Sequence, residues 1–470
     1  MAEIKFGTDG WRAIIGEDYT FDNVRMVVQA ISDYLNKGSG REKEVVIGYD
    51  MRFLSEKFAS AAAEVLCGNG IKVLLSKDNI STPATCLAIK NRKLDGGIII
   101  TASHNPAAYN GIKYRGDFAG PADPEMLKEI EALFRKNKPK LMSQEEAKRK
   151  KLLKIEDLTK EHIAFLKQYV DLKLLKKSSM KVVIDVMNGA GEDLLERVLE
   201  GTKITINTIN SERNPYFRGK NPEPIASNLE GLISIMKKGG YNIGLATDGD
   251  ADRIGAVDEK GNFISSHKIM SLILLHFIED RKMKGSVVKT ISGTSLLTKI
   301  AKKYKLKLHE TPVGFKYICK IMREEDVLIG GEESGGIGFK NYIPERDGVL
   351  SGLLLMEMMA YRKKSISGIL DDIKKEYGDF FTKRLDMKYP EDKKSRLIPA
   401  LKKSPPDKLL DSKVREVQSF DGIKFICEDE SWLLFRLSGT EPILRIYAEA
   451  NTEKKVDSII KSAKEMALKI

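Results

Sequence analysis

Apolar and polar positions along this chain follow a pattern that recurs three times. Each copy begins with a short apolar run, passes through a turn rich in Gly, Ser or Asp into a stretch with helical periodicity, and ends in a second apolar run. The copies begin at Val45–Asp50, Val182–Asp185 and Val287–Thr290. A strand, a short turn, a helix and a second strand make a βαβ-type unit. Three such units at intervals of about a hundred residues predict three related α/β domains.

The last part of the chain has a different pattern. After Pro405-Pro406 come three strand-like runs and a closing amphipathic helix, which predict a separate two-layer α+β domain from Glu376 onward. The segment Leu141–Lys167 is charged and helix-forming, and we expect it to connect the first domain to the second. The expected domains are residues 1–155, 156–262, 263–376 and 377–470.

Composition narrows the class of protein. The chain has 470 residues, 42% of them hydrophobic, which is enough for several packed cores. Its formal net charge is +12, but no basic arm or Arg-rich helix with interleaved aromatics is present, so we expect no nucleic-acid partner. We expect no membrane association, because no apolar run reaches the roughly 20 residues of a bilayer span. Four scattered cysteines and an amino terminus unlike a signal peptide favour a cytoplasmic enzyme. We expect this enzyme to be a monomer or a dimer.

The first polar cluster, Thr101–Pro106, follows the strand-like run Gly97–Ile100 and continues to Lys113. Open α/β sheets place their ligands at the carboxyl ends of strands, where Ser103 would lie. For one serine alone, an ordinary polar turn is the simpler interpretation. A Ser-His-Asp hydrolase is disfavoured, because the serine lacks the Gly-x-Ser-x-Gly elbow and His104 is its direct neighbour.

The second cluster has the sequence TDGDADR and lies between two strand-like runs. Asp248, Asp250 and Asp252 converge if this loop curls, and hard oxygen ligands suit Mg²⁺ or Ca²⁺. Together with Glu259, the same aspartates match the ligand positions of an EF-hand loop. Against the EF-hand, Arg253 stands where that loop requires Gly, and the flanks look like strands. A solvated acidic turn is a further alternative.

Two more clusters combine glycine with hydroxyl groups. GGEESGG, residues 330–336, can approach a ligand through its glycines while Glu and Ser side chains hold sugar hydroxyls. RLSGTEP, residues 436–442, offers an Arg, two hydroxyls and the N–H groups of a Gly turn, which suit a phosphate. Each alone is also compatible with an ordinary loop. Asn188-Gly-Ala-Gly191 has two glycines of a dinucleotide fingerprint, but Leu194 stands at the third position, so we discount it.

In combination, the motifs FGTDGWR, TASHNPAAYNGIK, DGDADR, GEESGG and RLSGTEP resemble, in order and over nearly the whole chain, the α-D-phosphohexomutase family. This family includes phosphoglucomutases, phosphomannomutases and phosphoglucosamine mutases. The resemblance implies three related α/β domains and a C-terminal α+β domain of TATA-binding-protein-like topology around a central cleft. It also implies interconversion of hexose 1-phosphate and hexose 6-phosphate by a phosphoserine enzyme. The implied intermediate is a hexose 1,6-bisphosphate, with glucose 1,6-bisphosphate as activator.

The resemblance implies one role for each loop. The serine loop carries the transferring phosphoryl group, and the aspartate loop binds Mg²⁺ with a phosphoserine oxygen as a further ligand. The third loop holds sugar hydroxyls, and the fourth holds the phosphate that is not reacting. Lys113 is the candidate for proton transfer. The residues implied at the transferring phosphate are Arg12, Ser103, His104, Lys113 and Arg253. Those implied at the metal are Ser103, Asp248, Asp250 and Asp252. Those implied around the sugar and the second phosphate are Lys316, Glu332, Ser334, Arg436, Ser438, Gly439 and Thr440.

The sugar loop also bears on the substrate. Some family members end this loop in His, as GEMSGH or GEQSGH, whereas this chain has Gly336, which leaves Lys113 as the more plausible base. The pair Glu332-Glu333 looks like the glucose-preferring members, while the phosphoglucosamine branch usually has Gln at the second position. We therefore expect a preference for glucose phosphate, with mannose phosphate as another substrate. The alternative hypothesis is a catalytically silent phosphosugar-binding protein of the same fold.

Overall fold

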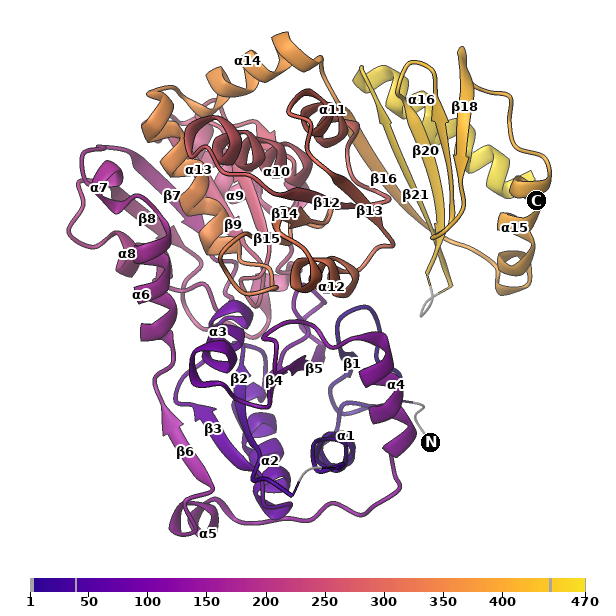
Figure 1. The fold of residues 1–470 in the computed structure, drawn as a ribbon. Coiled ribbons are helices and arrows are strands. Elements are labelled where there is room, and N and C mark those ends of the chain that lie inside the picture. The colour runs from indigo at the N-terminus through magenta and orange to yellow at the C-terminus, as the bar shows by residue number, and fades with distance from the viewer. Residues whose placement is uncertain (1–3, 39, 439–441, 470) are drawn as a thin grey trace. The chain divides into compact units, whose positions relative to one another are not determined.

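The structure is a computed structural model that describes residues 4–38, 40–438 and 442–469 (Figure 1). The chain divides into two compact units. The large unit consists of Met1–Gly285 and Gly314–Gly368, and the small unit of Ser286–Val313 and Ile369–Ile470.

The first sheet of the large unit has six strands in the order β1-β5-β4-β2-β3-β6. The strands β4, β2, β3 and β6 are parallel, and β5 is antiparallel to both of its neighbours. The strands are β1 (Trp11–Ile14), β2 (Glu44–Tyr49), β3 (Lys72–Ser76), β4 (Gly96–Ile100), β5 (Tyr109–Gly116) and β6 (Leu153–Glu156). The first predicted βαβ unit, with β2, α2 (Ser55–Gly68) and β3, is therefore confirmed.

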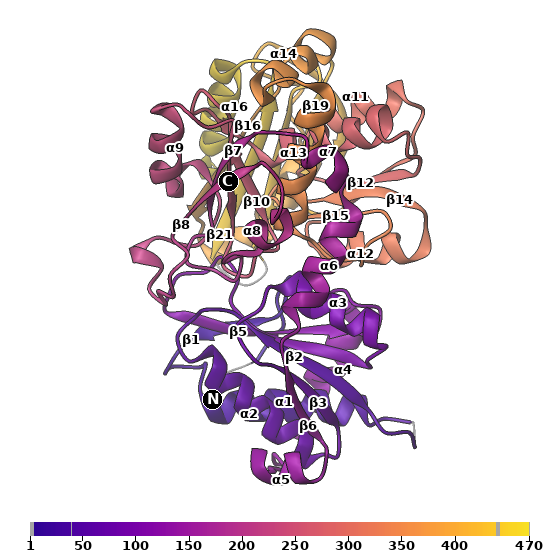
Figure 2. The same cartoon turned by 90° about the vertical axis from the view of Figure 1, so that its left-hand side faces the viewer.

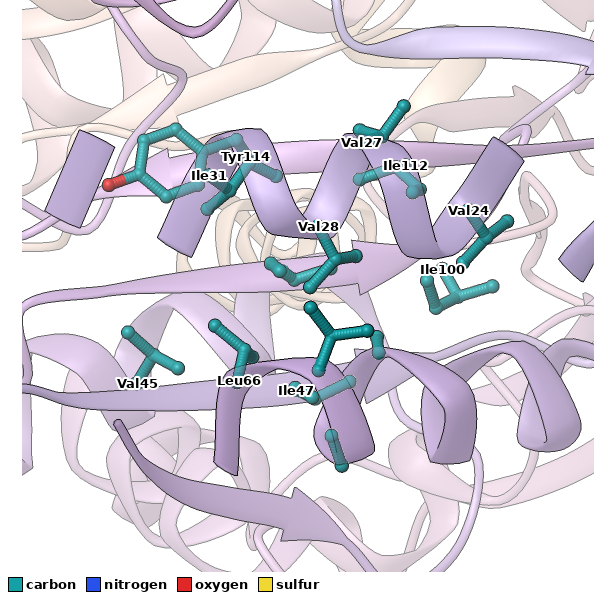
Figure 3. Close-up of a cluster of buried hydrophobic side chains, with 14 of the residues drawn as sticks. Val24, Val27, Val28, Ile31, Val45, Ile47, Leu66, Ile100, Ile112 and Tyr114 are labelled. Carbon is teal, nitrogen blue, oxygen red and sulfur yellow. The ribbon is translucent and has the colours of Figure 1, made fainter. Parts of the chain in front are cut away.

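Helices cover both faces of this sheet (Figures 1 and 2). On one face, Val45 and Ile47 of β2 share a core with α1 (Phe21–Leu35) and α2, as Figure 3 shows. On the other, Val46 lies on the side of α3 (Thr82–Arg92), because a Cβ on Gly97 would touch both Val46 and a side chain of that helix. Burial on both faces explains why the strands read as nearly continuous apolar runs.

The predicted connector Leu141–Lys167 is only partly helical. Besides α5 (Gln144–Arg149) and α6 (Thr159–Tyr169), it contains β6, which pairs in parallel with β3 at the edge of the first sheet. The expectation of a helical connector was therefore wrong for these residues. The strand is four residues long, Leu-Lys-Ile-Glu, and Ile155 on it is 39% exposed. So short an alternation at a sheet edge gives too weak a pattern to recognise.

The second sheet of the large unit has the order β11-β10-β9-β7-β8. Its strands are β7 (Lys181–Asp185), β8 (Thr205–Ile209), β9 (Ile243–Thr247), β10 (Ile254–Val257) and β11 (Phe263–Ile264). The helices between them are α8 (Leu194–Leu199) and α9 (Glu230–Lys237). Because β9 and β10 are antiparallel neighbours, the aspartate loop that joins them is held at both ends.

The rest of the large unit carries the sugar loop. GGEESGG joins β14 (Val327–Gly331) to β15 (Ile337–Phe339), which pair antiparallel. The strongly buried helix α13 (Gly348–Arg362) follows, capped at its start by Asp347, whose side chain accepts a hydrogen bond from the Leu350 N–H. The remaining helices are α4 (Pro124–Leu133), α7 (Leu172–Leu175), α10 (Ser266–Leu275) and α12 (Phe315–Glu324).

The small unit contains the third βαβ repeat and the C-terminal sheet. In the repeat, β12 (Ser286–Thr290) and β13 (Leu308–Thr311) pair in parallel on either side of α11 (Ser295–Lys303) in sequence. The sheet has the order β16-β21-β20-β19-β18-β17 and is antiparallel throughout. Its strands are β16 (Phe381–Lys388), β17 (Lys408–Leu409), β18 (Ser412–Gln418), β19 (Ile423–Cys427), β20 (Trp432–Leu437) and β21 (Ile443–Ala450). The remaining helices here are α14 (Ile366–Tyr377), α15 (Glu391–Lys403) and α16 (Glu453–Lys469). The first three residues of α14 belong to the large unit.

A helix that crosses a membrane must be both long and apolar. Within the described parts of the chain, no helix has both the length and the apolar character that a membrane crossing requires.

Candidate active site

Ser103 lies just beyond β4, in the large unit, and its backbone is held in an unusual conformation. Its φ is +51°, in the left-handed region, and its side chain is buried. Its N–H donates to Thr101 Oγ1 at 2.7 Å, and its own Oγ donates to Asp248 Oδ2 at 2.8 Å. An ordinary solvated turn would not bury the hydroxyl against a carboxylate from another sheet, so this geometry favours a functional serine.

The three aspartates do converge. Asp248 Oδ1 accepts the N–H groups of Asp252 and Arg253, which curls the loop. One carboxylate oxygen from each of Asp248, Asp250 and Asp252 lies within 4.8 Å of the other two. Asp250 Oδ1 and Asp252 Oδ1 are buried and accept no hydrogen bond from any residue that the structure describes. Buried, unpartnered carboxylate oxygens are costly unless they bind a cation, so the residues present fit a hard divalent ion.

The EF-hand alternative is wrong. The loop lies between the antiparallel strands β9 and β10 rather than between helices. Glu259, the expected last ligand, instead accepts a hydrogen bond from Ser367. A solvated acidic turn is also wrong, because Asp248, Asp250 and Asp252 are fully buried.

The pKa values of the aspartates in this loop shift in different directions. Burial raises the pKa of Asp248, and the neighbouring charges of Asp252 and Asp250 raise it further. Burial also acts to raise the pKa of Asp250, but Lys113 more than offsets this and the pKa falls below its ordinary value. The site therefore has an excess of negative charge around Asp248, next to the Ser103 hydroxyl.

Lys113, on β5, is surrounded by carboxylates. Its Nζ lies 2.7 Å from Asp250 Oδ2, 2.9 Å from Asp252 Oδ2 and 2.9 Å from Asp9 Oδ2. Burial alone would lower the pKa of Lys113, but these carboxylates outweigh burial and raise it. In this arrangement Lys113 is an ammonium group that joins the aspartate loop to the FGTDGWR segment through Asp9.

The other residues expected at the transferring phosphate surround the serine loop. Arg12 on β1 donates to Asn105 Oδ1 at 2.7 Å. Burial and the nearby cations Arg253 and Arg12 lower the pKa of His104, which keeps its imidazole neutral. Arg253 Nε lies 3.9 Å from Asp248 Oδ2. Positive charge therefore gathers on the side of the loop where a phosphate on Ser103 would add negative charge.

The sugar loop is joined to the aspartate loop through the backbone. Arg253 and Gly336 form an antiparallel bridge, and the Ile254 N–H donates to the Gly335 carbonyl at 3.1 Å. Gly335 has a φ of +93°, and a Cβ there would lie 2.6 Å from the Ile254 carbonyl oxygen. Only glycine therefore permits this close approach, which fixes Glu332 near the aspartates.

Ser334 and Lys316 are placed less tightly. Ser334 lies in the half-buried turn between β14 and β15. Lys316 lies in the first turn of α12, whose start packs against the FGTDGWR segment, since a Cβ on Gly314 would lie 2.9 Å from Thr8 Cγ2. Burial lowers the pKa of Lys316. The structure places both residues in the same unit as the serine loop.

Arg346 was not predicted. Its guanidinium lies 2.7 Å from Asp252 Oδ2, 2.5 Å from Asp9 Oδ2, 3.1 Å from Glu345 Oε1 and 3.7 Å from Glu332 Oε2. This one buried side chain thus contacts the aspartate loop, the FGTDGWR segment and the sugar loop. Burial raises the pKa of Glu332 to about 7, although Arg346 acts in the opposite direction. The only sequence signal was an Arg in a loop before an apolar helix, which is too common to single out.

The phosphate loop belongs to the small unit. Arg436, on β20, donates from Nε to Asp421 Oδ2 at 2.9 Å, and the Ser438 N–H donates to the Ile443 carbonyl at 2.9 Å. Gly439 and Thr440 lie outside the described residues. Arg445 stands directly opposite Arg436 across β20 and β21. Each of these arginines has a carboxylate beside it, Asp421 next to Arg436 and Asp386 Oδ2 at 3.8 Å from Arg445 Nε, which offsets the repulsion between like charges in cross-strand register.

The run Asn188-Gly-Ala-Gly191 contacts the aspartate loop. The Ala190 N–H donates to the Gly249 carbonyl at 3.0 Å, and a Cβ on Gly189 would lie 2.7 Å from the Asp248 carbonyl oxygen. These glycines pack against the aspartate loop, which supports the interpretation that they do not form a dinucleotide site.

The chain resembles known proteins along nearly its whole length. Models of the phosphoglucomutase/phosphomannomutase family match four successive parts of the chain. The α/β/α domains I, II and III match residues 3–141, 160–261 and 265–377, and the C-terminal domain matches residues 388–465. The chain therefore belongs to the phosphoglucomutase/phosphomannomutase family and has its four-domain architecture, with three α/β domains followed by a C-terminal domain.

Individual relatives agree on the family and differ in their named substrates. A phosphoglucomutase/phosphomannomutase of Thermococcus kodakarensis is 34% identical over 96% of this chain and 95% of its own. A protein of Pyrococcus furiosus named a probable phosphoglucosamine mutase is 32% identical over 98% of this chain and 96% of its own. A crystal structure from Thermus thermophilus, named as a candidate phosphomannomutase, superposes with a TM-score of 0.88 at 33% identity, covering 99% of both chains.

Proposed function

We propose that this phosphohexomutase interconverts hexose 1-phosphate and hexose 6-phosphate through a phosphorylated Ser103, with glucose preferred and mannose also accepted. The observation that carries the proposal is the Ser103 hydroxyl, buried 2.8 Å from Asp248 in a cluster of acidic and basic side chains. Phosphoryl transfer needs this combination of fixed position and compensating charge more than it needs covalent chemistry by the protein.

The chemical steps use one serine oxygen twice. In the first, the bond between phosphorus and Ser103 Oγ breaks as a bond to a sugar hydroxyl oxygen forms, and the proton of that hydroxyl ends on Ser103 Oγ. The resulting hexose 1,6-bisphosphate then turns, its other phosphoryl group returns to Ser103 Oγ, and the serine proton ends on the sugar oxygen that is released. The product is the isomeric hexose monophosphate, and the phosphoserine is regenerated. A free 1,6-bisphosphate is thus able to activate protein that lacks the phosphate.

Charge compensation follows from the described contacts. Asp248, Asp250 and Asp252, with a phosphoserine oxygen, would hold Mg²⁺, which supplies charge neutralisation when bound. On the protein side, Arg12 and Arg253 supply positive charge near the serine loop. The resemblance implies a proton-transfer role for Lys113; held as an ammonium, this residue would act by donating a proton and not first as a base.

The sugar preference rests on the third loop. The Glu332 carboxylate is buried near Arg346, where it can accept hydrogen bonds from sugar hydroxyls, and Ser334 adds a hydroxyl two residues on. The pair Glu332-Glu333 resembles the glucose-preferring members of the family, and this resemblance is what favours a neutral hexose over an amino sugar. Arg436 and Ser438, with Gly439 and Thr440, would hold the phosphate that is not reacting.

The test is a coupled assay on purified full-length protein with Mg²⁺ and a trace of glucose 1,6-bisphosphate. We expect the highest kcat/KM for glucose 1-phosphate, a few-fold to about tenfold less for mannose 1-phosphate, and the lowest for glucosamine 1-phosphate, since one hydroxyl contact contributes about 1 kcal/mol. A preference for glucosamine 1-phosphate would reverse the sugar assignment without touching the mechanism.

The covalent step is tested separately. Intact-mass measurement should find a fraction of molecules about 80 Da heavier, the mass of one added phosphoryl group, and peptide mapping should place it on Ser103. Ser103→Ala should lose activity by orders of magnitude and still bind substrate, whereas Ser179→Ala at an exposed position should behave as wild type. Turnover by Ser103→Ala at the wild-type rate would refute the phosphoserine mechanism. Binding without turnover by the wild-type protein would instead indicate a silent phosphosugar-binding protein.

A further inference from the structure

Arg52 lies three residues after the end of β2 and binds the backbone of the serine loop through hydrogen bonds. Its guanidinium donates to the carbonyl oxygens of Ser103 at 2.6 Å, Asn105 at 2.6 Å, Pro106 at 2.9 Å and Tyr109 at 3.0 Å. The side chain is 0% exposed. All four acceptors belong to one seven-residue stretch, 103–109. A planar guanidinium with five N–H donors can satisfy so many carbonyls at fixed angles, which a lysine ammonium with three donors cannot.

A second group fixes the other side of the Ser103 backbone. Asp50 accepts hydrogen bonds from the Thr101 hydroxyl at 2.6 Å and from the Arg52 N–H at 3.0 Å. The Thr101 Oγ1 in turn accepts the Ser103 N–H at 2.7 Å. The N–H of Ser103 is therefore held through Thr101 and Asp50, and its carbonyl through Arg52.

This double attachment accounts for the backbone conformation of the serine. A non-glycine residue with a φ of +51° is strained and persists only when its surroundings determine it. Gly249 of the aspartate loop completes the enclosure, because a Cβ there would lie 2.4 Å from the Ser103 carbonyl oxygen. The direction of the Ser103 side chain toward Asp248 thus follows from contacts to its backbone.

The outer face of Arg52 is closed by an aromatic ring. Phe217, in the short 3₁₀ turn η1 (Phe217–Gly219), places its ring centroid 4.8 Å from Arg52 Cζ. An ion pair of 2.6 Å between Arg213 and Glu56 joins the same long loop to α2. A cation–π contact of this kind keeps the guanidinium dry and restricts its rotation.

We propose that Arg52 is a positioning residue for the phosphoryl-carrying serine, with Phe217 holding the guanidinium in place. This inference rests on the proposed function, because it assumes that Ser103 carries the phosphoryl group. It assigns to Arg52 no contact with substrate or metal. Its effect is to set the direction of the Ser103 Oγ, and hence the alignment of the phosphoryl group with the incoming hydroxyl.

The inference predicts a specific kinetic pattern. A displacement of about 1 Å at the reacting atoms costs roughly 100-fold in rate, so Arg52→Lys should lower kcat by about 100-fold while KM for glucose 1-phosphate changes less than about threefold. The rate at which glucose 1,6-bisphosphate phosphorylates Ser103, followed by intact mass with Mg²⁺ present, should fall by a similar factor. Mg²⁺ affinity, measured by calorimetry, should stay within about twofold of wild type. The guanidinium of Arg52 binds backbone carbonyls of the serine loop and pairs with Asp50, which is not one of the proposed metal ligands.

Phe217→Leu provides a milder test, because it keeps the position apolar but removes the aromatic ring. It should lower kcat and the phosphorylation rate by a few-fold, whereas Tyr216→Leu, one residue earlier and 74% exposed, should leave both unchanged. If Arg52→Lys does not fold, Phe217→Leu decides the matter alone. Thermal unfolding of each variant allows activity to be expressed per folded molecule.

The outcomes separate this inference from the proposed function. A wild-type protein that neither turns over hexose phosphates nor takes phosphate on Ser103 overturns both. An active wild-type protein with an Arg52→Lys or Phe217→Leu variant of undiminished kcat per folded molecule overturns only the role of Arg52. A rise in KM with kcat unchanged overturns it as well, because that pattern indicates substrate binding and not placement of the serine.

Discussion

The guanidinium of Arg346 lies 2.7 Å from Asp252 Oδ2, and the same group reaches to within 3.7 Å of Glu332 on the sugar loop. One cation thus compensates a proposed metal ligand and a proposed sugar ligand. Any change in its position is expected to affect both, although neither loop was linked to it by sequence.

Arg346→Lys should separate charge from geometry. Lysine keeps the positive charge but cannot pair with Asp9, Asp252 and Glu332 together, so we expect KM for glucose 1-phosphate to rise about tenfold. Arg346→Met should destabilise the fold by about 3–5 kcal/mol, because it leaves buried carboxylates without their partner. Steady-state kinetics and urea unfolding measure the two effects. Arg323→Lys, which alters an ion pair with Asp123 nearer the surface, is the matched control.

Asp248→Asn should trade activity for stability. An Asn side-chain oxygen can still accept the N–H groups of Asp252 and Arg253, while the repulsion among three close carboxylates is relieved. In the presence of chelator we expect Tm to stay level or rise by about 1–3 °C, with activity lost by orders of magnitude. The increase in Tm that Mg²⁺ gives the wild-type protein should disappear.

The control for this prediction is Asp22→Asn, whose side chain is 93% exposed. It should retain both the activity and the response to Mg²⁺. Full wild-type activity in excess chelator, or a normal Mg²⁺ response in Asp248→Asn, would contradict a metal site at the aspartate loop.

Glu332 should give the enzyme a pH dependence. Its pKa is raised from 4.5 to about 7, so the carboxylate proposed to accept hydrogen bonds from sugar hydroxyls predominates only above that pH. We expect kcat/KM to rise by about tenfold between pH 6 and 8 and then to level off. In Glu332→Gln this step should be absent and kcat/KM low throughout.

The free energy of unfolding should change with pH in the opposite direction to kcat/KM. Between pH 4.5 and 7 the folded protein keeps a proton on Glu332 that the unfolded chain has released, so the free energy of unfolding falls as pH rises through this window. Glu332→Gln should remove that part of the slope in urea titrations. An unchanged slope would show that Glu332 titrates normally.

Gly249→Ala should damage the site more than the fold. A Cβ at this position would lie 2.4 Å from the Ser103 carbonyl oxygen and 3.2 Å from Pro222 Cγ, and backbone cannot move aside as a side-chain end can. We expect kcat to fall by about 100-fold, as for a displacement of about 1 Å. Gly231→Ala, in α9 with open space around it, should instead stabilise by about 0.5–1 kcal/mol and keep full activity.

Sequence reasoning succeeded where chemistry and pattern were local. The residues of the serine and aspartate loops are contiguous, and each loop follows a strand with a clear apolar run, so Ser103 and Asp250 could be named and then found together. The three βαβ units were recognised for the same reason.

The residues that were missed act over long distances in sequence. Arg346 pairs with Asp9, 337 positions away, and Arg52 binds a loop that begins 51 positions later. Nothing near either arginine marks its partner, and a buried Arg looks like a surface Arg in sequence.

The backbone bridge between Arg253 and Gly336 limits how the substrate of such a protein can change. Because Gly335 is pressed against the Ile254 carbonyl, adding or removing a residue between β14 and β15 would break the register that joins the two loops. Residues 333 and 334 lie in a half-buried turn, where a substitution leaves the loop length unchanged. New sugar preferences should therefore arise by substitution at these two positions, at constant loop length, and engineering should begin there.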